Sequence, residues 1–281
     1  MLGAVSVAIV AVGIVPMAST SQAEAMPDAP RGVFRVRCLF SHSLADDPIV
    51  KFKQPGASHL HDFFGNTSTN AFSTPAKLKL GGTTCQNTLD KSGYWVPNLT
   101  VDGASVTPFK ATAYYDNANK ALSTIMAPPS NLRIVAGNAH ATAPQGNVTE
   151  WDCGNNDSTP ATAEPPVSCP TGTNLVLHVR FPDCWDGTNR DSPDHQSHMA
   201  YNVNDVCPPT HPVPVARLRF NVHYPTQSGE NVALSSGGAY SGHADFFNGW
   251  NMTELKRLVK TCIRGGLNTQ DARCDQDMSN G

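Results

Sequence analysis

The sequence has few charged residues and no run of basic ones. Only 15% of its 281 residues are Asp, Glu, Lys or Arg, and the formal net charge is −3. Proteins that bind nucleic acid or an anionic membrane surface usually carry a basic patch or stripe. The composition therefore predicts neither kind of partner.

Several signatures of known catalytic chemistry are also missing. The chain has no Gly-x-Ser-x-Gly elbow, no Walker loop and no dinucleotide-binding fingerprint. These absences exclude the usual sequence arrangements of α/β-hydrolases and nucleotide-dependent enzymes. A Cys-x-x-Cys pair is absent too, which disfavours a zinc site built from thiolates.

The eight cysteines are even in number, and all of them follow residue 25. In an exported protein this pattern predicts disulfides, which would leave no thiol to act as a nucleophile. The order of the cysteines along the chain suggests one pairing, in which near neighbours are joined. The expected pairs are Cys38–Cys85, Cys153–Cys169, Cys184–Cys207 and Cys262–Cys274.

The N-terminus has the features of a signal peptide. An apolar run from Gly3 to Ala18 is long enough for a signal-peptide core and too short for a membrane span, although no Lys or Arg precedes it. Ala23 and Ala25 place small residues where a signal peptidase reads them. We therefore expect a signal peptide at residues 1–25 and one secreted, extracellular domain, without a membrane span, at residues 26–281.

The remaining sequence is typical of a mainly β protein. It contains 22 glycines and 22 prolines, which separate short apolar runs. Apolar and polar residues alternate over 34–40, 174–181 and 216–224, so each segment predicts a strand with one packed face. The pattern predicts an antiparallel β-sandwich or jelly-roll-like single domain with long disulfide-pinned loops.

One C-terminal segment predicts a helix. Asn251 can cap it, and Glu254 three residues later completes a pattern similar to a capping box. An apolar stripe follows, and Gly265-Gly266 ends the run. We expect this helix to pack on the sheet.

Histidine supplies the clearest signal for a functional site. The stretch Ser58-His59-Leu60-His61-Asp62-Phe63-Phe64 is partly repeated by His243-Ala244-Asp245-Phe246-Phe247. In an extended chain His59 and His61 point to the same side, because side chains alternate along a strand. His243 and Asp245 would form a second wall of the same pocket. Two more clusters are His195 with His198, and His42 near Asp46 and Asp47.

A metal site is one interpretation of these residues. A His-x-His pair with a distant histidine and a carboxylate suits zinc, copper or manganese, so His59, His61 and His243 are candidate ligands. Their ring nitrogens would then converge within about 4–5 Å of one point, since Zn–N bonds are about 2.0–2.1 Å.

Two other interpretations need no metal. A glycan hydrolase requires two carboxylates that flank the scissile bond, whereas a uronate-cleaving lyase requires a His or Tyr base. The candidate carboxylates are Asp183, Asp186, Asp194 and Asp245. In the remaining interpretation the histidines are hydrogen-bonded structural groups of a non-catalytic module.

The polar faces of the predicted strands also allow two interpretations. They contain His178, Arg180, Arg217, Arg219 and His223. These side chains either form the solvated outside of a sheet or line a groove that binds a polar polymer such as a glycan. The four tryptophans could stack on sugar rings, although core packing is the usual role of tryptophan.

A series of short motifs runs along most of the chain: Asp47-Pro48-Ile49-Val50, Ser58-His59-x-His61, Gly81-Gly82-Thr83-Thr84-Cys85, Tyr94-Trp95-Val96-Pro97, Phe181-Pro182-Asp183-Cys184-Trp185-Asp186-Gly187, Ser197-His198-Met199, Cys207-Pro208, His211-Pro212 and the segment 234–250. In these motifs the sequence resembles the secreted bacterial and fungal family catalogued as domain of unknown function 1996. Lys51-Phe52-Lys53 is more basic than this resemblance leads us to expect. The resemblance implies an exported single-domain protein and brings no established reaction.

Together these observations predict one pocket and a function. The pocket would gather His59, His61, Asp62, His195, His198, His243 and Asp245. We expect an extracellular or cell-wall polysaccharide-modifying enzyme, a hydrolase or a lyase, in which His59, His61 and His243 are metal ligands or the general base. Asp183, Asp186 or Asp245 would supply the acid or an orienting carboxylate. The alternative is a non-catalytic extracellular module that binds a glycan or a metal.

Overall fold

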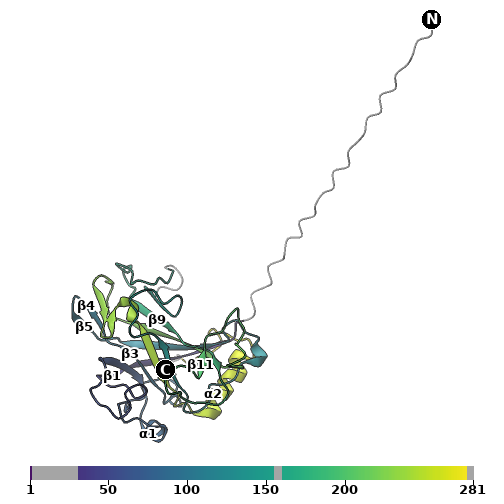
Figure 1. The fold of residues 1–281 in the computed structure, drawn as a ribbon, viewed down its shortest axis with the longest axis horizontal. Helices are drawn as coiled ribbons and strands as arrows, with labels where there is room; N and C mark the ends of the chain where they lie inside the picture. The colour runs from purple at the N-terminus through teal and green to yellow at the C-terminus, as the bar shows by residue number, and fades with distance from the viewer. Residues whose placement is uncertain (2–30, 155–159, 277–281) are drawn as a thin grey trace.

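The computed structural model describes Met1 and residues 31–154 and 160–276. The expected signal peptide at residues 1–25 is therefore almost entirely outside the described residues. Within them, strands form most of the regular structure, and the predicted mainly β fold is confirmed. Figure 1 shows α1 at the lower edge of the strands and α2 to the right of it.

The strands that build the fold vary from two to twelve residues. They are β1 (Val33–Leu44), β2 (His61–Gly65), β3 (Gly93–Pro97), β4 (Leu99–Val101), β5 (Ala104–Val106), β6 (Lys110–Asp116), β7 (Arg133–Gly137), β8 (Thr149–Asp152), β9 (Val176–Arg180), β10 (Cys184–Trp185), β11 (Met199–Ala200), β12 (Val213–Pro214), β13 (Arg217–His223), β14 (Val232–Leu234), β15 (Gly237–Gly238), β16 (His243–Phe247) and β17 (Asp275–Gln276). The α-helices are α1 (Pro75–Leu80) and α2 (Met252–Leu258), and α2 continues as a π-helical turn, Val259–Ile263. Two short 3-10 helices are η1 (Leu122–Thr124) and η2 (Ala239–Ser241).

The main sheet follows the order β7-β16-β3-β2-β1-β6-β13-β9-β8, and each neighbouring pair along it is antiparallel. β17 adds a short parallel pairing with β1. β7, at one end of this order, also lies against β9 near the other end. The sheet is therefore curled into a nearly closed barrel.

Every second side chain along the strands points into the barrel, and these side chains form its core. Phe34 and Val36 of β1 and Phe220 and Val222 of β13 are buried, as their spacing in the sequence predicted. Phe34 stacks on Tyr115 of β6 with ring centroids 4.8 Å apart. Successive residues on these strands point to opposite faces, so the residues between these ones face the outside of the barrel.

All four predicted disulfides are confirmed: Cys38–Cys85, Cys153–Cys169, Cys184–Cys207 and Cys262–Cys274. Cys38–Cys85 joins β1 to a long segment between β2 and β3. Cys184–Cys207 fastens a loop-rich stretch, and Cys262–Cys274 fastens the C-terminal helix. Disulfides of this kind restrict the unfolded chain and so favour the folded state.

The predicted C-terminal helix is present, with one difference at its start. The side chain of Asn251 accepts hydrogen bonds from the backbone of Thr253 and Glu254. The Glu254 side chain does not complete a capping box; it pairs with Arg257 on the next turn. The sequence reasoning also missed α1, which Thr74 caps and which begins at Pro75.

Within the described residues, no helix is both long and apolar enough to cross a membrane.

Candidate functional site

The register of three strands brings two distant histidines to one place. His61 of β2 pairs with Pro97 of β3, and Asp245 of β16 pairs with Trp95 two residues earlier on β3. His61 and His243 thus lie on either side of Pro97, on the outer face of the barrel. Alternation along β16 places His243 and Asp245 on the same face.

A glycine makes room for this arrangement on the next strand. Gly137 of β7 pairs with His243 and has a φ of +88°. A Cβ atom at this position would lie 2.7 Å from the carbonyl oxygen of Gly242 and 3.1 Å from the Cα atom of His243. A larger residue would therefore displace the start of β16 and the imidazole of His243.

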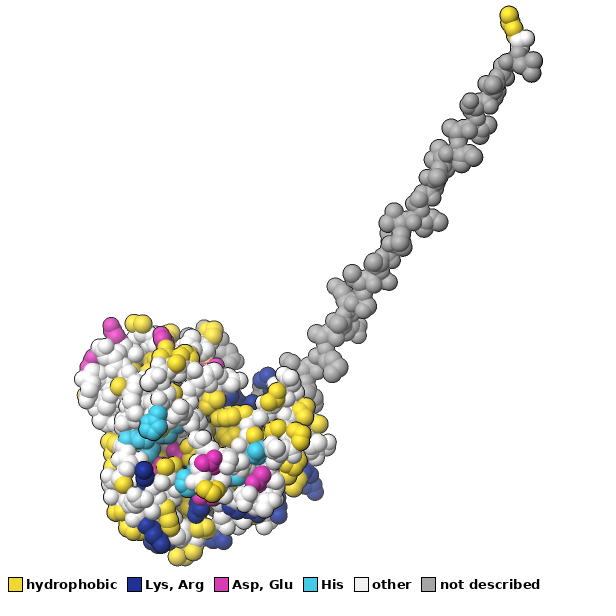
Figure 2. Space-filling view, viewed as in Figure 1, with side chains coloured by type: hydrophobic (Ala, Val, Ile, Leu, Met, Phe, Trp, Pro, Cys, Tyr) yellow, Lys and Arg dark blue, Asp and Glu magenta, His cyan; other side chains and the backbone are white. Residues whose placement is uncertain are grey.

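Three imidazoles meet at this point. The Nε2 atom of His59, from the loop before β2, lies 3.1 Å from the Nε2 atom of His243. The Nε2 atom of His61 lies 3.5 Å from the same nitrogen of His243. His61 and His243 are buried, whereas His59 is half-buried and so reaches toward the surface. Figure 2 shows several histidine side chains close together on the face viewed.

Backbone carbonyls fix the orientation of the two buried rings. The Nδ1 atom of His61 lies 2.9 Å from the carbonyl oxygen of Asp46, and that of His243 lies 2.8 Å from the carbonyl oxygen of Ser241. A carbonyl oxygen only accepts hydrogen bonds, so each Nδ1 carries the hydrogen. In both neutral rings Nε2 is left with a lone pair that points into the cluster.

The surroundings keep these rings neutral. Burial lowers the pKa of His61 well below its usual value, and the neighbouring His59 and His243 lower it further. Burial likewise lowers the pKa of His243 to about 4, against the opposing hydrogen bond to Ser241. Burial and the nearby His140 lower the pKa of His59. Neutral imidazole is the form that binds metals.

Two buried carboxyl groups lie next to the histidines. Asp47, His61 and Asp245 each offer one ligand atom, and these three atoms lie within 4.8 Å of one another. Asp47 accepts hydrogen bonds from the backbone of Ile49 and Val50. Burial still raises its pKa, although these bonds and the charge of His195 oppose the rise.

Asp245 is the least satisfied polar group near the site. Both of its carboxyl oxygens are buried and have no hydrogen-bond partner among the described residues. Burial, and then repulsion from Asp47, raises its pKa well above the usual value. The apolar residues on this face form a small core of their own: Ile49, Phe63, Leu78, Trp95 and Phe247. A carboxyl group at the edge of such a core is costly unless a cation or a donor compensates it.

Other predicted site residues lie at the edge of this cluster or away from it. His195 is close enough to affect the pKa of Asp47, and its Nδ1 atom lies 2.9 Å from a carboxyl oxygen of Asp191. Asp62 is separated from His61 by strand alternation and accepts hydrogen bonds from Ser43 and Asn98.

His198 contacts structural groups instead of the cluster. Its ring lies between the hydroxyl of Ser192, at 2.9 Å, and the carbonyl oxygen of Arg133, at 2.6 Å. The ring of His42 stacks on Phe63 with a centroid distance of 4.9 Å and contacts the carbonyl oxygen of Thr69. Both histidines support loops around the site.

The remaining candidate carboxylates serve loops elsewhere. Asp183 is buried in an ion pair with Lys120 and accepts hydrogen bonds from the side chain of Asn202. Asp186 accepts hydrogen bonds from the backbone of Thr188 and Asn189 and so closes a turn. Asp194 bonds the hydroxyls of Ser192 and Ser197. The structure brings none of these three to the histidines.

Sequence reasoning missed two neighbours of the cluster. In the sequence Asp47 was identified only as a neighbour of His42. It lies next to His61 because of how the loop before β2 folds, and that loop has no periodic pattern from which the contact could be predicted. His140 is exposed and acts on the pKa of both His59 and His243. No motif surrounds His140, so no spacing signal could have identified it.

The fold and the cluster define a disulfide-bonded β-barrel protein with a His/Asp cluster on its outer wall. Residues 47–250 match the family described as Domain of unknown function (DUF1996). This match covers most of the chain, so the protein belongs to that family, as the sequence motifs indicated. No curated protein and no solved structure matches the chain.

Proposed function

We propose that this protein is an extracellular, metal-dependent enzyme that modifies a polysaccharide, with the metal held by His59, His61 and His243. The single observation that carries the proposal is the convergence of their three Nε2 atoms, at separations of 3.1 and 3.5 Å from His243. Tetrahedral zinc with bonds of about 2.0–2.1 Å holds two ligand nitrogens about 3.3 Å apart. The cluster therefore has the dimensions of a metal site.

Hydrogen bonds among the three rings account for this arrangement less well than a bound metal does. If Nε2 of His59 carries a hydrogen, it can donate to Nε2 of His243. The lone pair of His61 would still face that of His243 at 3.5 Å, with both Nδ1 hydrogens committed to carbonyl oxygens. Two buried lone pairs in this relation repel each other, whereas a cation between them would satisfy all three rings.

The same geometry suits catalysis better than a purely structural metal. His59, His61 and His243 would hold the metal with three protein ligands, and a metal held in this way would supply Lewis-acid chemistry and lower the pKa of a water molecule. Asp245, whose nearest carboxyl oxygen lies within 4.8 Å of a ring nitrogen of His61, would be the carboxyl group that orients a water molecule beside the site. His59 reaches the surface and would give a large substrate access.

Separate observations support the location and the substrate class. Four disulfides favour an oxidising compartment such as the extracellular space. His59 is half-buried at the outer wall of the barrel, a position that a long polymer can reach more easily than the inside of an enclosed pocket. Zinc, copper and manganese all accept imidazole with oxygen ligands.

Elemental analysis of the purified chain, folded with its disulfides and dialysed against a weak chelator, tests the proposal. We expect about one zinc, copper or manganese ion per chain, since the histidines form one site. The double variant H59A/H61A should contain no metal and have no turnover. The control H178A/H211A also removes two imidazoles, both outside the cluster, and should retain the metal.

Thermal unfolding of the metal-free proteins separates a lost site from a lost fold. H59A/H61A should unfold cooperatively and within a few degrees of metal-free wild type. Absence of metal from the wild-type protein would refute the metal site. Retained metal and glycan affinity without any turnover would instead establish the non-catalytic binding module.

A further inference from the structure

Lysine is distributed unevenly along the chain. Five of the nine lysines lie in residues 48–92, a stretch without arginine that we call the lysine segment: Lys51, Lys53, Lys77, Lys79 and Lys91. In the described part of the chain, none of these five forms an ion pair. The segment thus presents unneutralised positive charge on a protein with a net charge of −3.

The carboxylates of the segment face inward. Its only two acidic residues, Asp62 and Asp90, are fully buried. Asp62 accepts hydrogen bonds from the side chains of Ser43 and Asn98, and Asp90 from the Tyr94 hydroxyl. Neither carboxylate is available to neutralise a surface lysine.

The segment is fastened directly to the histidine cluster through Asp46. One carboxyl oxygen of Asp46 accepts a hydrogen bond from the backbone of Gly56, and the other from that of Ala71. Its carbonyl oxygen contacts Nδ1 of His61. The backbone amide of Lys51 donates a hydrogen bond to the carbonyl oxygen of Asp47. The charge of Lys51 also lowers the pKa of the Asp47 carboxyl, which lies beside His61. The first lysines therefore lie at the rim of the site.

Exposed aromatic rings accompany these lysines. Phe52 and Phe72 are 37% and 44% exposed, which is unusual for phenylalanine. The ammonium of Lys53 lies 5.2 Å from the ring centroid of Phe52, and that of Lys77 lies 5.7 Å from the ring centroid of Phe72. A backbone hydrogen bond from Lys53 to Ala71 holds the two pairs together. Flat apolar rings beside cations suit a ligand that has both sugar faces and negative charges.

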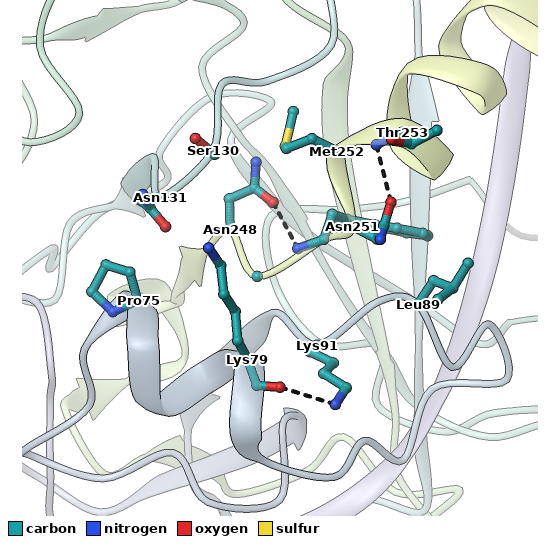
Figure 3. A pocket seen from close by; sticks show the side chains of 12 residues that line it. Pro75, Lys79, Leu89, Lys91, Ser130, Asn131, Asn248, Asn251, Met252 and Thr253 are labelled. Atoms are coloured by element: carbon teal, nitrogen blue, oxygen red, sulfur yellow. Dashed lines mark hydrogen bonds between the residues drawn. The ribbon is translucent and has the colours of Figure 1, made fainter.

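The lysines continue from this rim into a groove. α1 bears Lys77 and Lys79, and Lys79 lines a groove of about 510 Å³ with Lys91, Asn131 and Asn248. Figure 3 shows the Lys79 side chain extending toward Asn248, while the Lys91 ammonium donates to the Lys79 carbonyl oxygen at 3.0 Å. Positive charge is thus available at several successive points of the lysine segment, from the turn at Lys51 to the groove beside α1.

We infer that the lysine segment binds an anionic polysaccharide, a polymer of uronate or similarly charged sugars, and guides it to the histidine cluster. This inference rests on the proposed function, because it specifies the substrate of that site. Unpaired lysines beside a site attract a polyanion over distances of about a Debye length, and aromatic rings add contact with the sugar faces. A neutral glycan would gain nothing from the charges.

Binding of polygalacturonate, with a soluble neutral β-glucan for comparison, tests the inference on the full disulfide-bonded chain. We expect measurable affinity for polygalacturonate only, falling as salt rises. The variant K51Q/K53Q should lose two charge contacts. For single-stranded nucleic acid, each charge contact adds about 0.7 to the slope of log K against log salt. With the same value for this polyanion, the factor by which affinity falls between about 50 and 200 mM salt should be about sevenfold smaller in the variant. The control K256Q/K260Q removes two exposed lysines of the C-terminal helix and should leave binding unchanged.

Metal content, measured on the same samples, separates this inference from the proposed function. K51Q/K53Q should retain the metal of the wild type, whereas H59A/H61A should lose metal and keep its polygalacturonate affinity. Equal binding of the neutral glucan, or equal effects of the two lysine pairs, would overturn the inference. Tighter binding of single-stranded DNA would also overturn it and would identify the surface as a nucleic-acid site.

Discussion

The carboxylates of two regions have pKa values that shift in opposite directions. On the outer face of β6, β13 and β9, burial alone would raise the pKa of Asp116, but the charges of Arg219 and Arg217 outweigh it and lower the pKa. In the lysine segment, burial raises the pKa of Asp62 and of Asp90 to about 6, because only hydrogen bonds oppose it. The two regions differ in what contacts the carboxylate: Asp116 pairs with arginines, whereas Asp62 and Asp90 accept hydrogen bonds from neutral donors.

This contrast assigns different roles to the basic residues of the two regions. Arg219 and Arg217 both bond Asp116, and Arg180 lies 2.7 Å from Glu150 on β8. These arginines are committed to carboxylates of the same sheet face. The face lines a groove of about 580 Å³, yet its paired charges favour a solvated, self-neutralised surface over a polymer site. The lysines, by contrast, remain available to a ligand.

Removal of the disulfide that fastens the lysine segment should have the largest effect on stability. Cys38–Cys85 closes a loop with a sequence separation of 47, so the double variant C38A/C85A should lower the free energy of unfolding by about 4 kcal/mol. Chemical denaturation measures this. Because the loop contains His59 and His61, the metal should be bound more weakly as well.

A matched variant beside β8, the last strand in the sheet order, provides the control. Cys153–Cys169 has a separation of only 16, so C153A/C169A should cost about 3 kcal/mol and leave metal affinity unchanged. An equal loss of metal affinity in both variants would show that the lysine segment does not position the histidines separately from the rest of the fold.

Asp116→Asn should have the next largest effect. It leaves two arginines without their carboxylate, and the free energy of unfolding at pH 7 should fall by about 2–3 kcal/mol, below the range for fully buried pairs because the guanidinium groups are partly exposed. The folded-state pKa of Asp116 is lowered, so its contribution is present above the unfolded-state pKa and is lost as pH falls through the folded-state value. The variant and the wild type should therefore converge in stability at low pH, which urea denaturation at several pH values would show.

The buried Asp90 predicts a pH dependence of the opposite sign. Its folded-state pKa of about 6 exceeds the unfolded-state value of about 3.9, so the folded protein binds the proton more tightly. Stability is therefore highest below the unfolded-state pKa and falls as pH rises toward 6. Between pH 4.5 and 7.5 this single group should cost about 2 kcal/mol.

Asp90→Asn removes the titrating group and isolates this effect. Urea denaturation of the variant should show a smaller loss of stability from pH 4.5 to 7.5 than the wild type shows, with the remainder due to Asp62 and other groups. An unchanged pH profile would mean that Asp90 is ionised without cost in the folded protein, contrary to its burial.

Much of the barrel could be predicted because its strands depend on local alternation. Phe220 and Val222 are two residues apart, so strand alternation places both side chains on the inner face. The disulfide pairs could be predicted because each joins cysteines that are neighbours in the order along the chain. The histidine pairing was harder. His61 and His243 meet only because β2 and β16 both pair with β3. The order of strands in a sheet depends on the tertiary fold, so no local sequence pattern indicates that β3 lies between β2 and β16.

The surroundings of the site could not be predicted for a different reason. The groups that fix the two buried rings are the backbone carbonyls of Asp46 and Ser241, and every residue has a carbonyl. The burial of Asp245 depends on how a loop without periodicity packs Ile49 against Trp95 and Phe247. Side-chain identity suggests chemistry, but such contacts come from the tertiary fold.

The smallest expected change in stability comes from the lysines, and it provides the sharpest test of the contrast between the two regions. K51Q/K53Q breaks no ion pair, so the free energy of unfolding should change by less than about 0.5 kcal/mol, as for other surface substitutions. Arg217→Gln removes one of the two cations that hold Asp116 ionised and should cost about 1 kcal/mol, without affecting polygalacturonate affinity. If the lysine variant were the more destabilised of the two, its lysines would be structural, as the arginines are. A stable lysine variant with weakened polyanion binding would show that residues 48–92 carry positive charge for a ligand, because the stability of the folded chain does not depend on it.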